Sequence, residues 1–117
     1  MAMKKIIIIS ILCFIICGCS NRNSYQTISV DSAKTKIKEG AYLIDVRSRQ
    51  EYMENHIQGA INIPVDEIAN PKKKIISKND VIIVYCKSGG RSKQAADQLI
   101  DMGYQYVYDF GTMENWK

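Results

Sequence analysis

Histidine and cysteine are scarce in the body of this chain. Of its 117 residues, His56 is the only histidine, and Cys86 is the only one of four cysteines beyond residue 19. Transition-metal sites are usually built from three or four such side chains held close together. The sequence therefore shows no metal-ligand cluster.

Excess positive charge is also small. The formal net charge is +4, and loss of the first eighteen residues would remove Lys4 and Lys5 and leave +2. The one dense basic run is 72–74, which we interpret as a solvated surface, with contact to anionic lipid headgroups as the alternative. No basic patch interleaved with aromatic residues appears, so nucleic-acid binding is not expected.

The longest apolar run is too short to span a membrane. It covers the twelve residues Ile6–Cys17 and follows Lys4 and Lys5. A spanning helix needs about 20 residues, whereas a short apolar run after a positive start is typical of a cleaved signal peptide.

The next residues, Ile16-Cys17-Gly18-Cys19, resemble a bacterial lipobox. The resemblance implies a lipoprotein signal peptide over residues 1–18 and lipidation of Cys19, which holds the protein at the membrane. The location would be extracytoplasmic, on the bacterial cell membrane or a periplasmic leaflet. An uncleaved anchor helix or a core helix is the alternative. We expect residues 19–27 to form a polar tether.

The rest of the chain, 28–117, has the length and composition of one globular domain. Short apolar segments alternate with helical patterns, which favours an α/β fold with a mostly parallel central sheet of about five strands flanked by helices. The predicted strands cover 25–30, 41–46, 59–63, 81–85 and 104–108, and the predicted helices 31–37, 47–55, 66–69 and 91–102. The second helix would place Arg47 and Glu51 one turn apart.

Two side chains with reactive chemistry end predicted strands. Asp45 lies at the end of one apolar strand, and Cys86 directly follows another. Active sites of parallel sheets lie at the carboxyl ends of the strands. Cys86 has no partner cysteine in the domain, and a lone thiol in an exported protein is a candidate reactive group.

The segment Cys86–Ser92, CKSGGRS, carries this chemistry. Gly89 and Gly90 allow a tight turn that aims successive N–H groups inward, and a helix begins near Arg91. Lys87 and Arg91 add positive charge, so every feature favours the nucleophilic thiolate. The alternative is a buried structural cysteine before an ordinary glycine-rich turn. Phosphatases, arsenate reductases and sulfurtransferases all use versions of the arrangement.

Two parts of the sequence together resemble the single-domain rhodanese family. Cys86–Ser92 is similar to the active-site loop of that family, while Leu43–Arg47, Glu51-Tyr52 and His56–Pro64 are similar to its N-terminal signature. The resemblance extends from about Ile28 to Trp116. It implies a rhodanese-like fold and a sulfurtransferase activity.

The resemblance also implies a reaction cycle. The Cys86 thiolate would attack the outer sulfur of a donor such as thiosulfate and become a persulfide held by the loop N–H groups. A thiol or cyanide would then accept that sulfur. No metal or organic cofactor is implied. The expected partners are small sulfur-containing anions or thiols, and a thiol reductant protein that keeps Cys86 reduced.

The other loop residues have supporting roles under this interpretation. Lys87 would attract anionic donors or simply be solvated. Ser88 and Ser92 would donate hydrogen bonds to bound sulfur or cap the helix, and we favour capping for Ser92.

Charged residues outside the loop are expected to support it. Arg91 would orient the loop, or pair with Asp45 or Glu51. We interpret Asp45 and Arg47 as a structural ion pair and His56 as a structural histidine.

Two other functions fit parts of the pattern. Phosphatases of related fold have five residues between the cysteine and the arginine, whereas here four, Lys87–Gly90, separate Cys86 from Arg91. A phosphate group should therefore fit poorly. A non-catalytic module that carries a persulfide or binds a partner is the other alternative. The sequence identifies neither the physiological donor nor the acceptor.

Overall fold

A computed structural model of the chain describes residues 24–70 and 77–117. The predicted signal peptide, the lipidation site Cys19 and the basic run at 72–74 lie outside the described residues. None of the helices in the two described ranges has the length and apolarity needed to cross a bilayer.

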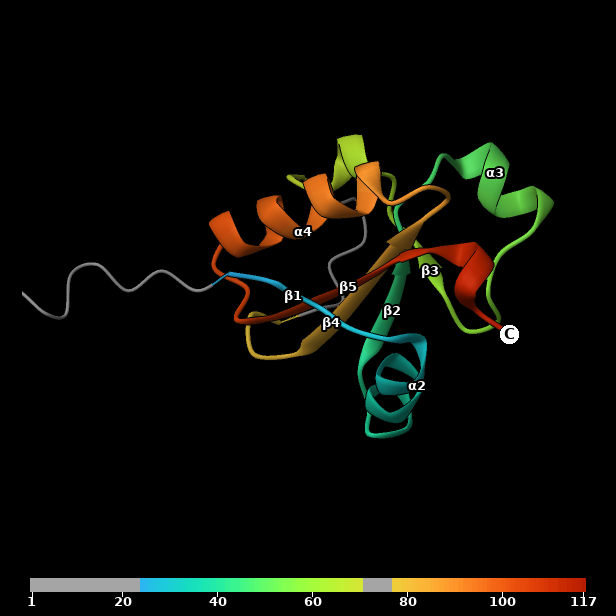
Figure 1. The fold of residues 1–117 in the computed structure, drawn as a ribbon. Coiled ribbons are helices and arrows are strands. Elements are labelled where there is room, and N and C mark those ends of the chain that lie inside the picture. The colour runs from blue at the N-terminus through green and yellow to red at the C-terminus, as the bar shows by residue number, and fades with distance from the viewer. Residues whose placement is uncertain (1–23, 71–76) are drawn as a thin grey trace, which may run out of the picture.

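Within the described residues, five strands form one parallel sheet in the order β1-β5-β4-β2-β3 (Figure 1). The strands are β1 (Gln26–Thr27), β2 (Tyr42–Asp45), β3 (Ile61–Asn62), β4 (Val81–Cys86) and β5 (Tyr106–Thr112). The predicted α/β fold with a parallel sheet is therefore confirmed.

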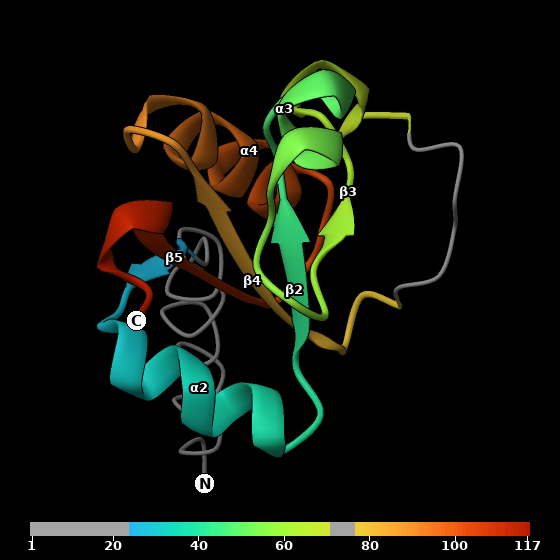
Figure 2. The same cartoon turned by 90° about the vertical axis from the view of Figure 1, so that its right-hand side faces the viewer.

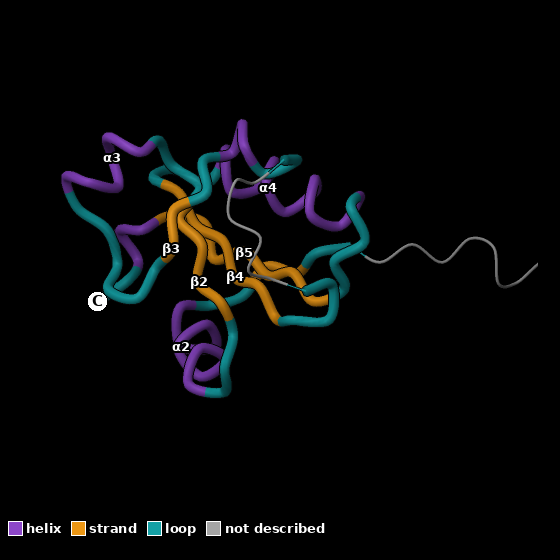
Figure 3. The backbone as a smooth tube through the Cα atoms, turned by 180° about the vertical axis from the view of Figure 1, so that it is seen from behind, coloured by secondary structure: helices purple, strands orange, loops and turns teal. Residues whose placement is uncertain are grey.

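Helices cover both faces of this sheet. They are α2 (Val30–Lys38), α3 (Arg49–Glu54) and α4 (Gly90–Asp101), with two short 3-10 turns, η3 (Val65–Glu67) and η4 (Met113–Asn115). Helix α4 lies on one face and α2 on the opposite face (Figures 1 and 2). The view from behind shows the same layers, with the strands between these two helices (Figure 3).

Strand β4 lies at the centre of the fold, between β2 and β5. It is buried from Ile82 to Cys86 because both faces of the sheet are covered. Side chains alternate along a strand, so Ile82, Val84 and Cys86 join the core under α4, while Ile83 and Tyr85 join the core on the α2 side. The strand continues one residue beyond the predicted end at 85, and Cys86 pairs with Thr112 of β5.

Capping explains where the first two helices begin, at residues 30 and 49 in place of the predicted 31 and 47. Helix α2 begins at Val30 because the Ser29 hydroxyl accepts a hydrogen bond from the Ser32 amide at 3.1 Å. Helix α3 begins at Arg49, not at residue 47, because Ser48 and Glu51 form a capping box.

The amino end of the domain also differs from expectation. Gln26 and Thr27 pair with Tyr108 and Asp109 of β5, which places the last two residues of the predicted tether, 19–27, in the sheet. Both side chains are exposed to solvent. Backbone pairing with β5, rather than burial of an apolar side chain, therefore holds these two residues in the sheet. The strand predicted over 25–30 is therefore present but only two residues long, and it overlaps the end of the predicted tether.

Candidate active site

Cys86 lies at the carboxyl end of β4, directly before the loop that leads into α4. It has no exposed surface. The amide N–H groups of Gly89 and Ser92 donate hydrogen bonds to its Sγ, at 2.9 and 3.3 Å. Both donors come from the segment that the sequence singled out, so the loop folds back over the sulfur.

Gly89 makes this return possible. Its φ is +100° and its ψ −18°, a left-handed conformation that residues with a Cβ seldom adopt. Gly90, by contrast, is the first residue of α4 and has no positive φ. Of the two loop glycines, only Gly89 is required by backbone conformation.

Ser92 does not cap α4, contrary to the prediction. The N-cap residue is Gly89, which has no side chain to offer. Ser92 lies within the first turn, where its hydroxyl donates to the Gly89 carbonyl oxygen at 3.2 Å and its amide is directed at Cys86. Ser92 therefore fixes the turn from inside the helix.

The opposite end of the loop is held by β5. The Thr112 hydroxyl donates to the Lys87 carbonyl oxygen at 2.5 Å. The side chains of Lys87 and Ser88 are exposed, and neither has a polar partner among the described residues. Of the loop side chains, these two are free to meet a ligand.

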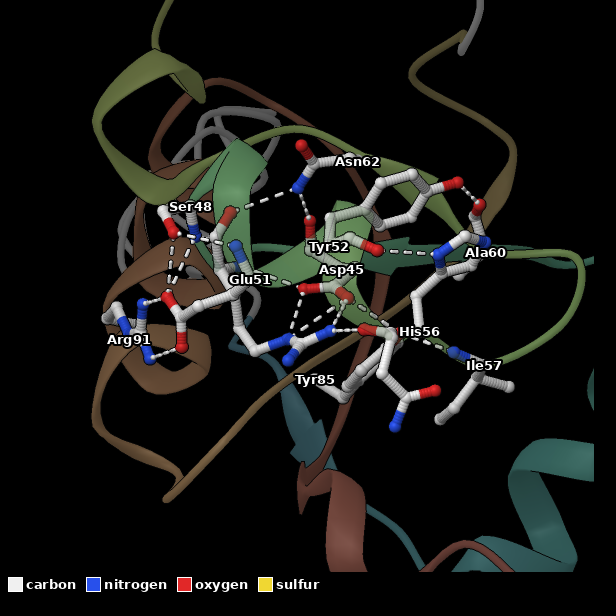
Figure 4. A network of polar contacts seen from close by, with 12 residues as sticks. Asp45, Ser48, Glu51, Tyr52, His56, Ile57, Ala60, Asn62, Tyr85 and Arg91 are labelled. Carbon is white, nitrogen blue, oxygen red and sulfur yellow. Dashed lines mark hydrogen bonds and ion pairs between the residues drawn. The ribbon is translucent and has the colours of Figure 1, made fainter.

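Arg91 pairs with Glu51, which is one of the two partners considered from the sequence (Figure 4). Arg91 Nη1 and Nη2 lie 2.6 and 3.1 Å from the two Glu51 carboxylate oxygens. The hydrogen bonds from Arg91 to Glu51 raise the pKa of Arg91. Negative charge on Cys86 raises it further, by a smaller amount. Helix α3 is thereby tied to the first turn of α4.

The same carboxylate also completes the capping box of α3. Glu51 Oε1 accepts from the Ser48 amide at 3.2 Å and from its hydroxyl at 2.9 Å. The hydrogen bond from Arg91 and those from Ser48 lower the pKa of Glu51 to about 2, although burial acts in the other direction. Glu51 is therefore a charged anchor between two helix starts.

Asp45 and Arg47 form a second, buried ion pair, as expected from the sequence. Asp45 is fully buried and Arg47 only 5% exposed, with Arg47 Nη2 at 2.7 Å from Asp45 Oδ2. The Tyr85 hydroxyl donates to the same oxygen at 2.8 Å and accepts from the Ile57 amide at 3.1 Å (Figure 4). Burial, the largest cause, raises the pKa of Tyr85, which stays protonated as a donor. Arg47 also donates to the Asn55 carbonyl oxygen at 2.5 Å.

These contacts position the segment that follows α3. His56 stacks on Tyr52 with ring centroids 3.7 Å apart, and its Nδ1 hydrogen-bonds the Tyr52 carbonyl oxygen at 2.8 Å. The Tyr52 hydroxyl donates to the Ala60 carbonyl oxygen at 2.6 Å. His56 therefore serves the structure of this segment, as expected.

A cavity of about 620 Å³ opens beside the loop. It is lined by Arg47, Glu51, residues 54–58, Lys87, Met113, Glu114 and Trp116. Lys87 follows Cys86 in the chain and is the loop residue that lines the cavity, whereas Cys86 itself does not line it. Because Cys86 has no exposed surface in this conformation, a substrate reaches Sγ only after the residues that cover it have moved.

Sequence reasoning missed the C-terminal wall of this cavity. Met113, Glu114 and Trp116 follow β5, whose carboxyl end lies beside that of β4. The strand-end rule that selected Asp45 and Cys86 would also have selected these residues. Within the described residues, no three His, Cys, Asp or Glu side chains converge as metal ligands.

Comparison with known proteins gives consistent matches. A family model for the rhodanese-like domain matches residues 29–117. Thiosulfate sulfurtransferase PspE of Escherichia coli K12 is 42% identical over 76 residues, which cover 62% of this chain and 70% of that protein. Protein HIGH ARSENIC CONTENT 1 of Arabidopsis thaliana is 32% identical over 97 residues, 74% of this chain but only 57% of that longer protein. The solved structure of the human single-domain sulfurtransferase TSTD1 superposes with a TM-score of 0.71 at 28% identity, covering 77% and 93% of the two chains.

The Glu51–Arg91 pair should make stability depend on acid pH. The pKa of Glu51 falls from 4.5 to about 2 on folding, so its contribution is complete above about pH 4.5 and is lost as the pH falls through 2. Near neutral pH, Glu51→Gln should lower the free energy of unfolding by on the order of 1 kcal/mol, since the pair is partly exposed. Urea unfolding at several pH values measures this difference, which should shrink between pH 4.5 and 2.

Arg91→Gln removes the same pair from the other side and should show the same convergence with wild type. A difference that stays constant across this pH range in both variants would contradict the assigned pairing.

Proposed function

The chain belongs to the rhodanese-like family, and from this premise we propose that it is a sulfurtransferase that carries sulfur as a persulfide on Cys86. The relative PspE bears the name thiosulfate sulfurtransferase, which supports sulfur-containing anions as donors. The observation that carries the proposal is the pair of amide hydrogen bonds to Cys86 Sγ, from Gly89 and Ser92.

In the first half-reaction, the Cys86 thiolate attacks the outer sulfur of thiosulfate. A new S–S bond forms to Sγ, the S–S bond of the donor breaks, and sulfite leaves with the bonding electron pair. No oxidant is needed because sulfane sulfur moves from one sulfur atom to another. The product is a Cys86 persulfide with one negative charge.

Three features of the site favour negative charge at this sulfur. The amides of Gly89 and Ser92 donate directly to it. The N-terminus of the twelve-residue helix α4 adds a positive dipole end. The exposed Lys87 side chain adds a positive charge at the cavity, without a partner among the described residues. Burial of Cys86 strengthens the two amide contacts, because water does not screen them.

In the second half-reaction, a thiolate or cyanide attacks the outer sulfur of the persulfide. The bond between that sulfur and Sγ breaks, and its electron pair returns to Sγ, which regenerates the thiolate. Only Cys86 forms covalent bonds in either step. Arg91 does not contact the sulfur, since its guanidinium is engaged by Glu51.

A non-catalytic persulfide carrier is the second candidate function. The complete burial of Cys86 favours it, because a protected persulfide would be stored rather than turned over. Repeated turnover with thiosulfate and cyanide separates the two functions, since a carrier would accept one sulfur atom per chain and stop.

We also propose that the protein is a lipoprotein held outside the cytoplasm through Cys19. The support is the lipobox-like sequence after a short apolar run. Cys19→Ser should move the protein out of the membrane fraction while the domain still accepts sulfur. Mass spectrometry of the membrane form provides the check: an unmodified Cys19 at an uncut N-terminus would refute lipidation.

The sulfurtransferase proposal predicts a defined change in mass. After exposure to thiosulfate, the purified protein should gain one sulfur atom, on the peptide that contains Cys86, and a reductant should reverse it. Cys86→Ser should gain none and should lose transfer to cyanide completely. The circular dichroism spectrum of Cys86→Ser should match wild type, because the substitution exchanges sulfur for oxygen at constant shape.

Ser32→Ala is the control, since it removes an exposed hydroxyl on α2, away from the cavity. It should keep the added sulfur. Transfer that persists in Cys86→Ser, with Ser32→Ala and wild type unchanged, would remove the mechanism.

A further inference from the structure

Two carboxylates line the cavity beside Lys87 without a cationic partner among residues 24–70 and 77–117. Glu54 ends α3 and Glu114 lies in η4, and both line the cavity. Neither forms an ion pair within the described part of the chain. The site therefore offers two free negative charges next to one free positive charge, Lys87.

The other charged groups of the cavity wall are already paired. Arg47 is bound to the buried Asp45, and Glu51 is bound to Arg91. These four side chains hold the wall in place and cancel one another's charge. A ligand is thus attracted or repelled mainly by Glu54, Glu114 and Lys87.

The cavity is also too large for the simplest substrates of the proposed reaction. Its volume of about 620 Å³ lies in the range of about 300–1,000 Å³ that holds organic ligands, whereas thiosulfate and cyanide have only a few atoms. Part of its wall is apolar: Met113 and Trp116 contribute to it, and Trp116 is supported by Phe110 with ring centroids 5.4 Å apart. The expected occupant is therefore an organic molecule with at least one positive group.

We propose that this cavity is the acceptor site, and that Glu54 and Glu114 select organic thiols that carry an ammonium group. The inference rests on the proposed sulfurtransferase function and adds its acceptor class. The ammonium group would lie near the two carboxylates, while the thiolate of the same molecule is directed toward the loop beside Lys87. The same carboxylates disfavour anionic thiols.

The transfer step balances without a further reactant. The acceptor thiol loses its proton to solvent, and its sulfur forms a bond to the outer sulfur of the Cys86 persulfide. The bond from that sulfur to Sγ breaks, and Sγ keeps the electron pair. The products are a persulfide of the acceptor and the free Cys86 thiolate.

The experiment measures two steps separately: loading, in which Cys86 accepts sulfur from thiosulfate, and discharge, in which the persulfide passes that sulfur to a thiol. Wild type and Glu54→Gln/Glu114→Gln are first loaded from thiosulfate, and the added sulfur is verified by mass. Discharge in a single turnover is then timed with cysteamine, N-acetylcysteamine and 3-mercaptopropionate, which carry a positive, a neutral and a negative group. Each thiol is compared only between protein variants, so its intrinsic nucleophilicity cancels.

We expect the double variant to discharge to cysteamine about three- to tenfold more slowly than wild type, as two partly exposed charge pairs would give. The rate with N-acetylcysteamine should stay within about twofold, and the rate with 3-mercaptopropionate should rise. High salt should reduce the wild-type preference for cysteamine. Glu54→Gln and Glu114→Gln alone should each give part of the effect.

Glu39→Gln is the matched control, since it removes one exposed carboxylate at the C-cap of α2, away from the cavity. The proposal is overturned if the double variant loads normally but keeps the wild-type ratio of cysteamine to N-acetylcysteamine rates. It is also overturned if Glu39→Gln shifts that ratio equally. Failure of the wild type to load would instead refute the sulfurtransferase function itself, and this inference with it.

Discussion

The site depends on how one loop places two backbone amides against one sulfur atom. Cys86 ends the central strand, and Gly89, in a left-handed conformation, turns the chain so that its own N–H and that of Ser92 point back at Sγ. The turn also starts α4, so the helix N-terminus is aimed at the same place. Backbone donors need no side-chain reorganisation during the reaction, which makes them suited to stabilise charge that appears on sulfur.

Two ion pairs support this loop from different sides. The buried Asp45–Arg47 pair, with the Tyr85 hydroxyl, holds the end of β2 against the end of β4. The Glu51–Arg91 pair ties α3 to the first turn of α4. Breaking a buried pair leaves an uncompensated charge, so the Asp45–Arg47 pair contributes mainly to folding. The partly exposed Glu51–Arg91 pair holds α3, which forms part of the cavity wall, against α4.

The sequence was sufficient for the sheet and for the position of Cys86 at the turn into a helix. Apolar runs of strand length predicted the parallel sheet, and the cysteine before two glycines predicted a turn into a helix. It also predicted a structural role for Asp45 and Arg47. Each of these features depends on residues close together in the chain, where periodicity and turn preferences act.

What could not be predicted involves residues far apart or competing local interactions. Glu51 lies 40 residues from Arg91, and no local pattern chooses between it and Asp45 as the partner. The expected spacing of Arg47 and Glu51 on one helix failed because the Ser48 capping box starts α3 after Arg47. The wall formed by Glu114 and Trp116 exists only because β5 lies beside β4.

The sequence also could not tell the two loop glycines apart, although the structure does. A Cβ at either position would meet no heavy atom within 4 Å, so steric space does not distinguish them. Only Gly89 has a positive φ, and an L-residue there is strained by about 1–2 kcal/mol, which would move its amide away from the sulfur.

The most direct test of the account is therefore the rate of persulfide formation on Cys86 from thiosulfate in Gly89→Ala and Gly90→Ala. The account predicts a clear loss of rate in Gly89→Ala and a near wild-type rate in Gly90→Ala, whereas equal rates in the two variants would contradict the central role of the amide–sulfur contacts.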